Sequence, residues 1–78
     1  MEAEVASVTP AEQFGTNLRL IRRSYGWSQE TVAALAGLHR TEVQKLESGK
    51  RDPRLRTIVR LACALRVDPG LLVVGVRQ

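Results

Sequence analysis

Residues 29–49, Gln-Glu-Thr-Val-Ala-Ala-Leu-Ala-Gly-Leu-His-Arg-Thr-Glu-Val-Gln-Lys-Leu-Glu-Ser-Gly, decide the fold of this chain. Apolar residues recur at helical spacing on both sides of Gly37, which stands where a first short helix must end and the backbone needs a positive φ. The stretch therefore predicts two short helices joined by a tight glycine turn, the helix-turn-helix unit. The inner faces of the two helices are marked by Val32, Ala33 and Ala36, and by Val43 and Leu46.

One helix is expected before this stretch. Thr9-Pro10-Ala11-Glu12 has the pattern of a capping box with proline at the first helical position. Gly26 ends this helix, and residues 1–8, which show no periodicity, are expected to form a flexible tail. The apolar positions of the helix are Phe14, Leu18 and Ile21.

Capping residues and prolines also set the bounds of the other helices. Ser28 is the expected N-cap of a helix over about residues 29–36, and His39 takes the capping position of a helix over about residues 40–49. Residues 50–53 end in proline and form a loop. The next helix should bury a stripe of Leu55, Ile58, Leu61, Ala62 and Leu65, and Asp68-Pro69 should begin a short last helix that carries Leu71 and Leu72.

Length and composition indicate one small all-α domain over residues 9–78. The chain has 78 residues, of which 44% are hydrophobic and 26% are charged. No apolar run approaches the roughly 18 residues that span a membrane, and the N-terminus is acidic where a secretory signal would be basic, so we expect a cytoplasmic protein. One cysteine (Cys63) and one histidine (His39) cannot supply a structural zinc site, so we expect no metal or other cofactor. No glycine-rich phosphate loop or paired nucleophile and base indicates an enzyme.

Positive charge is concentrated in the second half of the chain. The net charge is +4, yet residues 1–18 contain three glutamates and no basic residue, while residues 40–60 contain seven basic residues against three acidic ones. Basic residues gathered over one region are typical of nucleic-acid-binding proteins, although many basic stretches are only solvated surface. The seven are Arg40, Lys45, Lys50, Arg51, Arg54, Arg56 and Arg60.

The outward face of the helix over residues 40–49 carries side chains that suit DNA bases. When Val43 and Leu46 point inward, polar residues occupy the opposite face at 100° per residue. Arg and Lys match guanine in the major groove, Gln matches adenine, and the Thr methyl group matches that of thymine. The alternative is an ordinary solvated polar face. The residues of this face are Arg40, Thr41, Gln44, Lys45 and Ser48.

Gln29 lies in the first turn of the preceding helix, where free backbone N–H groups and the helix dipole favour a phosphate. Its side chain could hold a DNA phosphate and also brace a side chain at the start of the next helix. Lys50 and Arg51, directly after that helix, could bind the next phosphates. The alternative for Gln29 is an ordinary helix-start residue.

A larger set of residues has a joint spacing that is more specific than any single motif. It comprises Leu18, Arg22, Gly26, Ser28-Gln29-Glu30, Ala33, Ala36-Gly37, His39-Arg40-Thr41, Val43, Leu46-Glu47, Gly49-Lys50-Arg51, Pro53, Leu55, Leu61, Ala62, Ala64-Leu65 and Val67. This set resembles the pattern of the Cro/C1-type (XRE-family) helix-turn-helix regulators, and the resemblance covers residues 14–72. The resemblance implies a lambda-repressor-like five-helix bundle that binds operator DNA, usually as a dimer on a two-fold symmetric site.

The resemblance also implies a role for the matched positions. Arg22 and Glu47 match a pair that in the family bridges the first helix to the end of the third, so we expect them to be structural. The base-contacting residues would be Arg40, Thr41, Gln44 and Lys45, and the backbone-contacting residues would be Ser28, Gln29, His39, Ser48, Lys50 and Arg51.

Four positions depart from the family pattern or fit it in more than one way. Arg54 stands where a small capping residue is usual, so that cap is frayed or Arg54 faces phosphate. Leu35 is a scattered surface residue or part of a contact patch. Glu42 caps its helix, accepts from a cytosine amino group or faces a neighbouring subunit, and His39 is a cap or a phosphate contact.

Three further features are expected to serve packing. Tyr25 and Trp27 should pack at the junction of the first two helices, and Cys63 should be a small buried residue. The segment over about residues 68–78 is more apolar than a small domain leaves exposed, which favours a subunit contact there. The predicted dimer contacts are Leu71, Leu72, Val73, Val74 and Val76.

These features favour sequence-specific DNA binding by a small transcriptional regulator, by default a repressor. A homodimer would place two copies of the helix over residues 40–49 about 34 Å apart on a near-palindromic site. The length leaves no space for a ligand-sensing domain, so control would come from concentration, dimerisation or a partner protein. Controllers of restriction–modification operons, phage repressors and antitoxins all fit. The alternative from another class is a protein-interaction module or antitoxin-like partner protein on the same fold.

Overall fold

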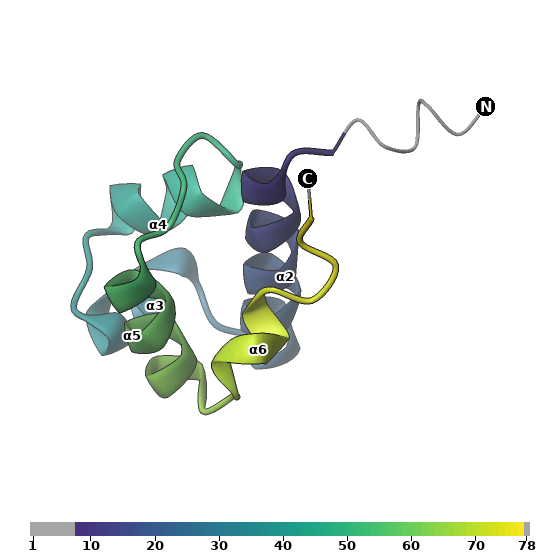
Figure 1. Cartoon of the computed structure of the whole chain (residues 1–78). Helices are drawn as coiled ribbons and strands as arrows, with labels where there is room; N and C mark the ends of the chain where they lie inside the picture. The colour runs from purple at the N-terminus through teal and green to yellow at the C-terminus, as the bar shows by residue number, and fades with distance from the viewer. Residues whose placement is uncertain (1–7, 78) are drawn as a thin grey trace.

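The computed structural model describes residues 8–77, which form five helices and no strand (Figure 1). The predicted all-α architecture is therefore confirmed, while the expected N-terminal tail lies, apart from Val8, outside the described residues. Within this range no helix is long and apolar enough to cross a membrane. The helices are α2 (Pro10–Ser24), α3 (Gln29–Ala36), α4 (Arg40–Glu47), α5 (Leu55–Leu65) and α6 (Pro69–Leu72).

The first two helices begin with the predicted caps. The hydroxyl of Thr9 accepts from the backbone N–H of Glu12 at 3.1 Å, and the Glu12 carboxylate accepts from the backbone N–H of Thr9 at 3.0 Å. Ser28 Oγ accepts from the N–H of Thr31 at 3.0 Å. Gly37 ends α3 with a φ of 72°, as the sequence predicted. These contacts satisfy backbone groups that a helix end otherwise leaves without partners.

The next two helices begin without such help. His39 and Arg54 occupy the N-cap positions of α4 and α5, but neither side chain makes a capping hydrogen bond. The first backbone N–H groups of both helices are therefore available to solvent or to a ligand. α5 also ends at Arg66 in the left-handed conformation, with φ 57° and ψ 45°, which costs a non-glycine residue about 1 kcal/mol.

The helices enclose one core, to which all five contribute. α4 packs against both α3 and α2, and α5 packs against α3 and α6. The inner faces predicted for α2, α3 and α4 are the ones that the structure buries. The buried cluster consists of Phe14, Leu18, Val32, Ala33, Ala36, Val43, Leu46, Leu61, Ala62, Leu65 and Leu72.

The face that α5 buries differs from the prediction at two residues. Leu55 was expected in the core but is 77% exposed, because it occupies the first turn, directly after an exposed loop. Cys63 was expected to be buried but is exposed, because it lies 200° around the helix from Leu61, on the outer face. Thr57, at 8% exposed, takes an inward position that hydrophobicity does not predict.

The C-terminal segment returns along α2 toward its first turn (Figure 1). The amide of Asn17 donates to the carbonyl oxygens of Leu72 and Val74 at 2.9 and 2.8 Å. Leu72 is fully buried, so its prediction as a dimer contact is wrong: α6 uses this side chain to close the core. Leu71 and Val74, in contrast, are 48% and 58% exposed.

Tyr25 and Trp27 have the packing role predicted for them. Their rings stack at the α2–α3 junction with centroids 4.4 Å apart and planes 13° from parallel. Trp27 packs against the core, and the Tyr25 hydroxyl donates to the carbonyl oxygen of Leu65. The pair thus ties the α2–α3 turn to the end of α5.

Candidate nucleic-acid interface

α4 separates the predicted base-contacting side chains from the core. Val43 is 0% exposed and Leu46 is 1% exposed, which fixes the rotation of the helix about its own axis. All the polar residues predicted for the outward face are exposed, and they share one face of a helix of eight residues. These residues are Arg40, Thr41, Gln44, Lys45 and, directly after the helix, Ser48.

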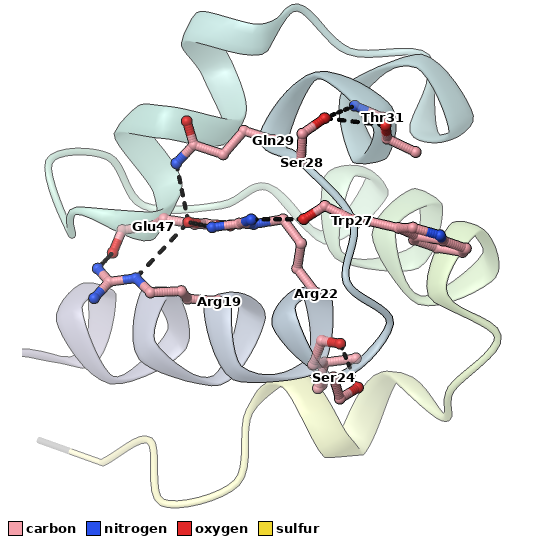
Figure 2. A network of polar contacts seen from close by, with 9 residues as sticks. Arg19, Arg22, Ser24, Trp27, Ser28, Gln29, Thr31 and Glu47 are labelled. Carbon is pink, nitrogen blue, oxygen red and sulfur yellow. Dashed lines mark hydrogen bonds and ion pairs between the residues drawn. The ribbon is translucent and has the colours of Figure 1, made fainter.

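A network around Glu47 fixes the C-terminal end of α4 (Figure 2). Glu47 is 3% exposed, and its carboxylate accepts from Arg22 Nε at 2.6 Å and from Arg22 Nη2 at 2.9 Å. Arg22 also donates from Nη1 to the carbonyl oxygen of Trp27 at 2.8 Å. The pair that the family resemblance implied is thus present as a two-point contact, the strongest geometry between these groups.

The Arg22–Glu47 contact is an ion pair that the fold isolates from water. Arg22 is 9% exposed. Its hydrogen bonds to Glu47 raise the pKa of Arg22, and so does the Coulombic attraction of the carboxylate, whereas burial lowers it. Breaking such a pair from one side leaves a buried charge without a partner, which is costly even where the intact pair adds little net stability.

Gln29 joins the same network from α3. Its side-chain nitrogen Nε2 donates to Glu47 Oε1 at 3.0 Å (Figure 2). We expected Gln29 to brace a side chain at the start of α4, and this is wrong: its partner is the last residue of α4. Because an amide nitrogen has two hydrogens and the backbone N–H of a first-turn residue is free of helical partners, Gln29 keeps donors for a phosphate.

Two residues that position α4 were missed from the sequence. Gly15 lies where α2 crosses α4, and a Cβ at this position would lie 2.5 Å from the Glu47 carbonyl oxygen and against that of Leu46. Arg19, one turn later, donates from Nη2 to the Glu47 carbonyl oxygen at 3.0 Å. A glycine inside a strongly periodic helix is the signal that could have indicated the close approach, since it costs about 1 kcal/mol relative to alanine.

The predicted backbone-contacting residues lie around the two ends of this unit. Ser48 follows Glu47 in the chain, and its hydroxyl donates to the Lys45 carbonyl oxygen at 3.1 Å. Ser28 caps α3: its hydroxyl accepts from the backbone N–H of Thr31 at 3.0 Å and lies 3.0 Å from the Thr31 hydroxyl. His39, Lys50 and Arg51 are exposed.

A polar hollow of about 530 Å³ lies beside α4, between the α3–α4 turn and the start of α5. Two carboxylates, those of the half-buried Glu42 and the exposed Asp52, line it together with four arginines. No ion pair within 4.0 Å joins any of these arginines to another residue of the range 8–77. The hollow therefore adds a positively charged flank to α4. The arginines are Arg51, Arg54, Arg56 and Arg60.

A family model described as Helix-turn-helix (HTH_3) matches residues 18–72. The match covers more than half of the chain, and the chain belongs to the Cro/C1-type (XRE) helix-turn-helix family of transcriptional regulators. α4 is thus the second helix of a helix-turn-helix unit, and the family binds DNA.

Two relatives show how the similarity is spread. The control protein C.SmaI of Serratia marcescens is 35% identical over 72 residues, covering 91% of this chain and 86% of that protein. The prophage-derived HTH-type transcriptional regulator YonR of Bacillus subtilis is 37% identical over 62 residues, covering 80% of this chain and 57% of that protein. The chain therefore spans little more than half of the length of YonR.

Two solved structures of transcription regulators are similar to this chain in both sequence and fold. The restriction-modification controller protein C.AhdI of Aeromonas hydrophila is 44% identical with a TM-score of 0.78, over 80% of this chain and 94% of that chain. The hypothetical transcription factor NHTF from Neisseria is 36% identical with a TM-score of 0.78, over 81% of this chain and 72% of that chain.

Proposed function

We propose that this protein is a sequence-specific transcriptional regulator that inserts α4 into the major groove of an operator. The observation that carries the proposal is the arrangement of α4: Arg40, Thr41, Gln44 and Lys45 are exposed on one face of a helix whose other face is locked in the core. Side chains of these types form direct hydrogen bonds and methyl contacts with base edges. Since DNA is their target, the protein would act in the cytoplasm of a bacterial cell.

Phosphate contacts would orient α4 in the groove. Gln29, at the start of α3, contacts Glu47 at the C-terminal end of α4, and Ser48, Lys50 and Arg51 follow that end in the chain, so the proposed phosphate contacts gather there. Exposed cations that neutralise phosphates release counterions, so affinity should fall steeply as salt is raised. The arginine-lined hollow beside α4 extends this positive surface.

We further propose that the protein acts as a homodimer through its C-terminal segment. Leu71, Val73 and Val74 are 48%, 39% and 58% exposed and follow one another closely in the chain. Adjacent apolar side chains of this size are typical of subunit contacts. A two-fold dimer would place two copies of α4 about 34 Å apart, one turn of DNA, and would select a near-palindromic operator.

The dimer is tested with Leu71→Glu and Val74→Glu in one chain. Deleting the segment is unsuitable, because the deletion would also remove Leu72 from the core. Sedimentation should show a dimer for the wild-type protein and a monomer for this variant. The control Leu35→Glu, at a residue 55% exposed on α3, should remain a dimer. A dimer that survives the double substitution would contradict the assigned surface.

The regulatory role proposed is control of transcription by occupying a promoter, by default as a repressor. The similarity to C.SmaI and C.AhdI suggests a controller of a restriction–modification operon as the specific setting. Because the described helices serve packing and the DNA-facing unit, control would come from concentration, dimerisation or a partner protein.

The experiment that tests this function is selection of bound duplexes from a random DNA pool. The proposal predicts an enriched, near-palindromic consensus whose half-sites are centred about one helical turn apart. No enrichment would contradict the proposal and would favour the alternative, a protein-interaction module on the same fold.

A further inference from the structure

One stripe of α2 receives the C-terminal end of α4. Gly15, Arg19 and Arg22 are spaced i, i+4 and i+7, so they lie on one face of α2. All three face the same target: Gly15 lies against the carbonyl oxygens at the end of α4, and both arginines contact Glu47. Glycine removes the steric barrier, and the two arginines then supply the polar contacts across the crossing.

The two arginines divide Glu47 between them. Arg22 holds the carboxylate at two points, whereas Arg19 donates from Nη2 to the main-chain carbonyl oxygen at 3.0 Å. Arg19 Nε lies 3.8 Å from Glu47 Oε1, close enough for a weaker ion pair. A side-chain contact fixes a side chain, but a contact with the backbone carbonyl fixes the helix itself. Of the three side chains that bond Glu47, Arg19 is therefore the one that contacts the backbone of α4 directly.

The length of α4 turns a small error at this end into a large one at the other. From Glu47 to Arg40 the helix axis runs about 10 Å at a rise of 1.5 Å per residue. A tilt of about 10° at Glu47 would move Arg40 by about 2 Å. Site geometry generally has to be held to within about 0.5 Å for full effect, so the fit of Arg40 and Thr41 to bases depends on the contacts at Glu47.

We propose that Arg19 is a positioning residue for sequence recognition, which sets the angle at which α4 enters the major groove. The inference rests on the proposed function. The rival interpretation is a simple phosphate contact, since the Arg19 side chain is 40% exposed and uses one of its five N–H groups on Glu47 O. The two interpretations differ in what they predict for non-specific DNA.

The test compares Arg19→Met with the matched control Arg23→Met. Arg23 is an exposed arginine on the same helix, so the control removes the same charge. Binding is measured by fluorescence anisotropy on the duplex selected from the random pool and on a scrambled duplex of equal length, each over a series of salt concentrations. Circular dichroism confirms that each variant is folded at the temperature of measurement.

Positioning predicts that Arg19→Met lowers affinity for the selected duplex about tenfold and leaves scrambled-duplex affinity and the salt dependence equal to those of Arg23→Met. An equal loss on both duplexes, with a salt slope reduced by about one ion relative to the control, would identify a phosphate contact and overturn the proposal. Reduced thermal stability with an unchanged ratio of the two affinities would also overturn it, because the role would then be purely structural.

A second variant keeps the test decisive if Arg19→Met is unfolded. Arg19→Lys keeps the positive charge but not the planar group that spans Glu47 O and its carboxylate. Positioning predicts a smaller loss of the affinity ratio, about threefold, with scrambled-duplex affinity unchanged; a full rescue of the ratio contradicts it. If wild-type protein already shows no preference for the selected duplex, the proposed function itself fails, and this outcome is distinct from a normal wild type with a normal Arg19 variant.

Discussion

The two ends of α4 differ in how the protein holds them. At the C-terminal end, Glu47 is tied to α2 and α3 by hydrogen bonds from Arg19, Arg22 and Gln29, and Gly15 lets the backbones approach closely. At the N-terminal end, His39 stands at the cap position without a side-chain hydrogen bond. Of the proposed base-contacting residues, Arg40 and Thr41 lie at this second end, and Gln44 and Lys45 follow one turn later. The protein thus fixes the C-terminal end of α4 with side-chain hydrogen bonds and leaves the first N–H groups of the helix without a side-chain cap.

The comparison explains why the C-terminal end has so many contacts. A binding site works best when rigid elements hold it and when its contacts are supported from behind. Here the support comes from residues outside the proposed base-contacting set, and water or, in the proposed complex, DNA can satisfy the N–H groups left uncapped at the start of α4. The difference predicts opposite effects on stability at the two ends. Removing the carboxylate of Glu47 should lower the free energy of unfolding, whereas placing a capping side chain at position 39 should raise it.

The largest effect is expected from Glu47→Ala. The substitution leaves the Arg22 guanidinium buried without its partner, and the cost should be about 3–5 kcal/mol of unfolding free energy. Urea denaturation followed by circular dichroism measures it. Glu30→Ala, at an exposed glutamate of α3, should change stability by about 0.5 kcal/mol or less. A loss at Glu47 as small as that of the control would contradict the buried-pair interpretation.

Gly15→Ala comes next, and the expected sign is the informative part. Helix propensity alone predicts that alanine stabilises the interior of α2 by about 1 kcal/mol. The steric clash with two carbonyl oxygens of α4 predicts the opposite, a net loss of about 2–3 kcal/mol, because a backbone cannot move aside as a flexible side chain can. The same urea titration decides between them, and a stabilised variant would show that α2 and α4 are not in close contact.

Arg40→Ala probes the free end of α4. It should weaken binding to the selected duplex by about 1–3 kcal/mol and relax the preference at one base pair of each half-site. Stability should be unchanged, because Arg40 is exposed. Anisotropy titrations on the selected duplex and on its single-base variants give both quantities. If specific binding is unchanged, the assignment of the base-contacting face is wrong.

The smallest effect is expected from His39→Ser. Serine is a preferred N-cap and should stabilise α4 by about 0.5–1 kcal/mol, since His39 makes no capping hydrogen bond. A rise in the melting temperature of a few degrees measures this gain. The corresponding change at the cap of α3, Ser28→Ala, should lower stability by a similar amount, because Ser28 already accepts from Thr31. If His39→Ser gave no gain in stability, the backbone N–H groups in the first turn of α4 would already have other partners.

Much of the fold could be predicted because its signals are local. The Thr9–Glu12 capping box, the Ser28 cap and the left-handed Gly37 all depend on residues within one turn of each other. Periodicity gave the inner faces of the first three helices for the same reason. Arg22 and Glu47 are 25 residues apart in the chain, so this pair could be expected only from the resemblance to a family.

The failures share a cause, which is tertiary packing. Whether Leu55, Cys63 and Leu72 are covered depends on which elements pack over each turn, and their hydrophobicity is the same in either case. The contact of Arg19 with a backbone carbonyl leaves no trace in its residue type, because surface arginines on α2 have the same local surroundings. Such positions have to be found in the structure.

Amide hydrogen exchange tests the difference between the two ends of α4 most directly. Four amides donate to backbone carbonyls at similar distances: Glu42 and Val43 to His39 O at 3.0 and 3.2 Å, Ser48 to Gln44 O at 3.1 Å, and Gly49 to Leu46 O at 3.2 Å. Exchange in the free protein should be slower for Ser48 and Gly49 than for Glu42 and Val43. Binding of the selected duplex should slow mainly Glu42 and Val43. Equal protection at both ends of the free helix, or slowing confined to Ser48 and Gly49, would contradict a recognition helix that is fixed at its C-terminal end.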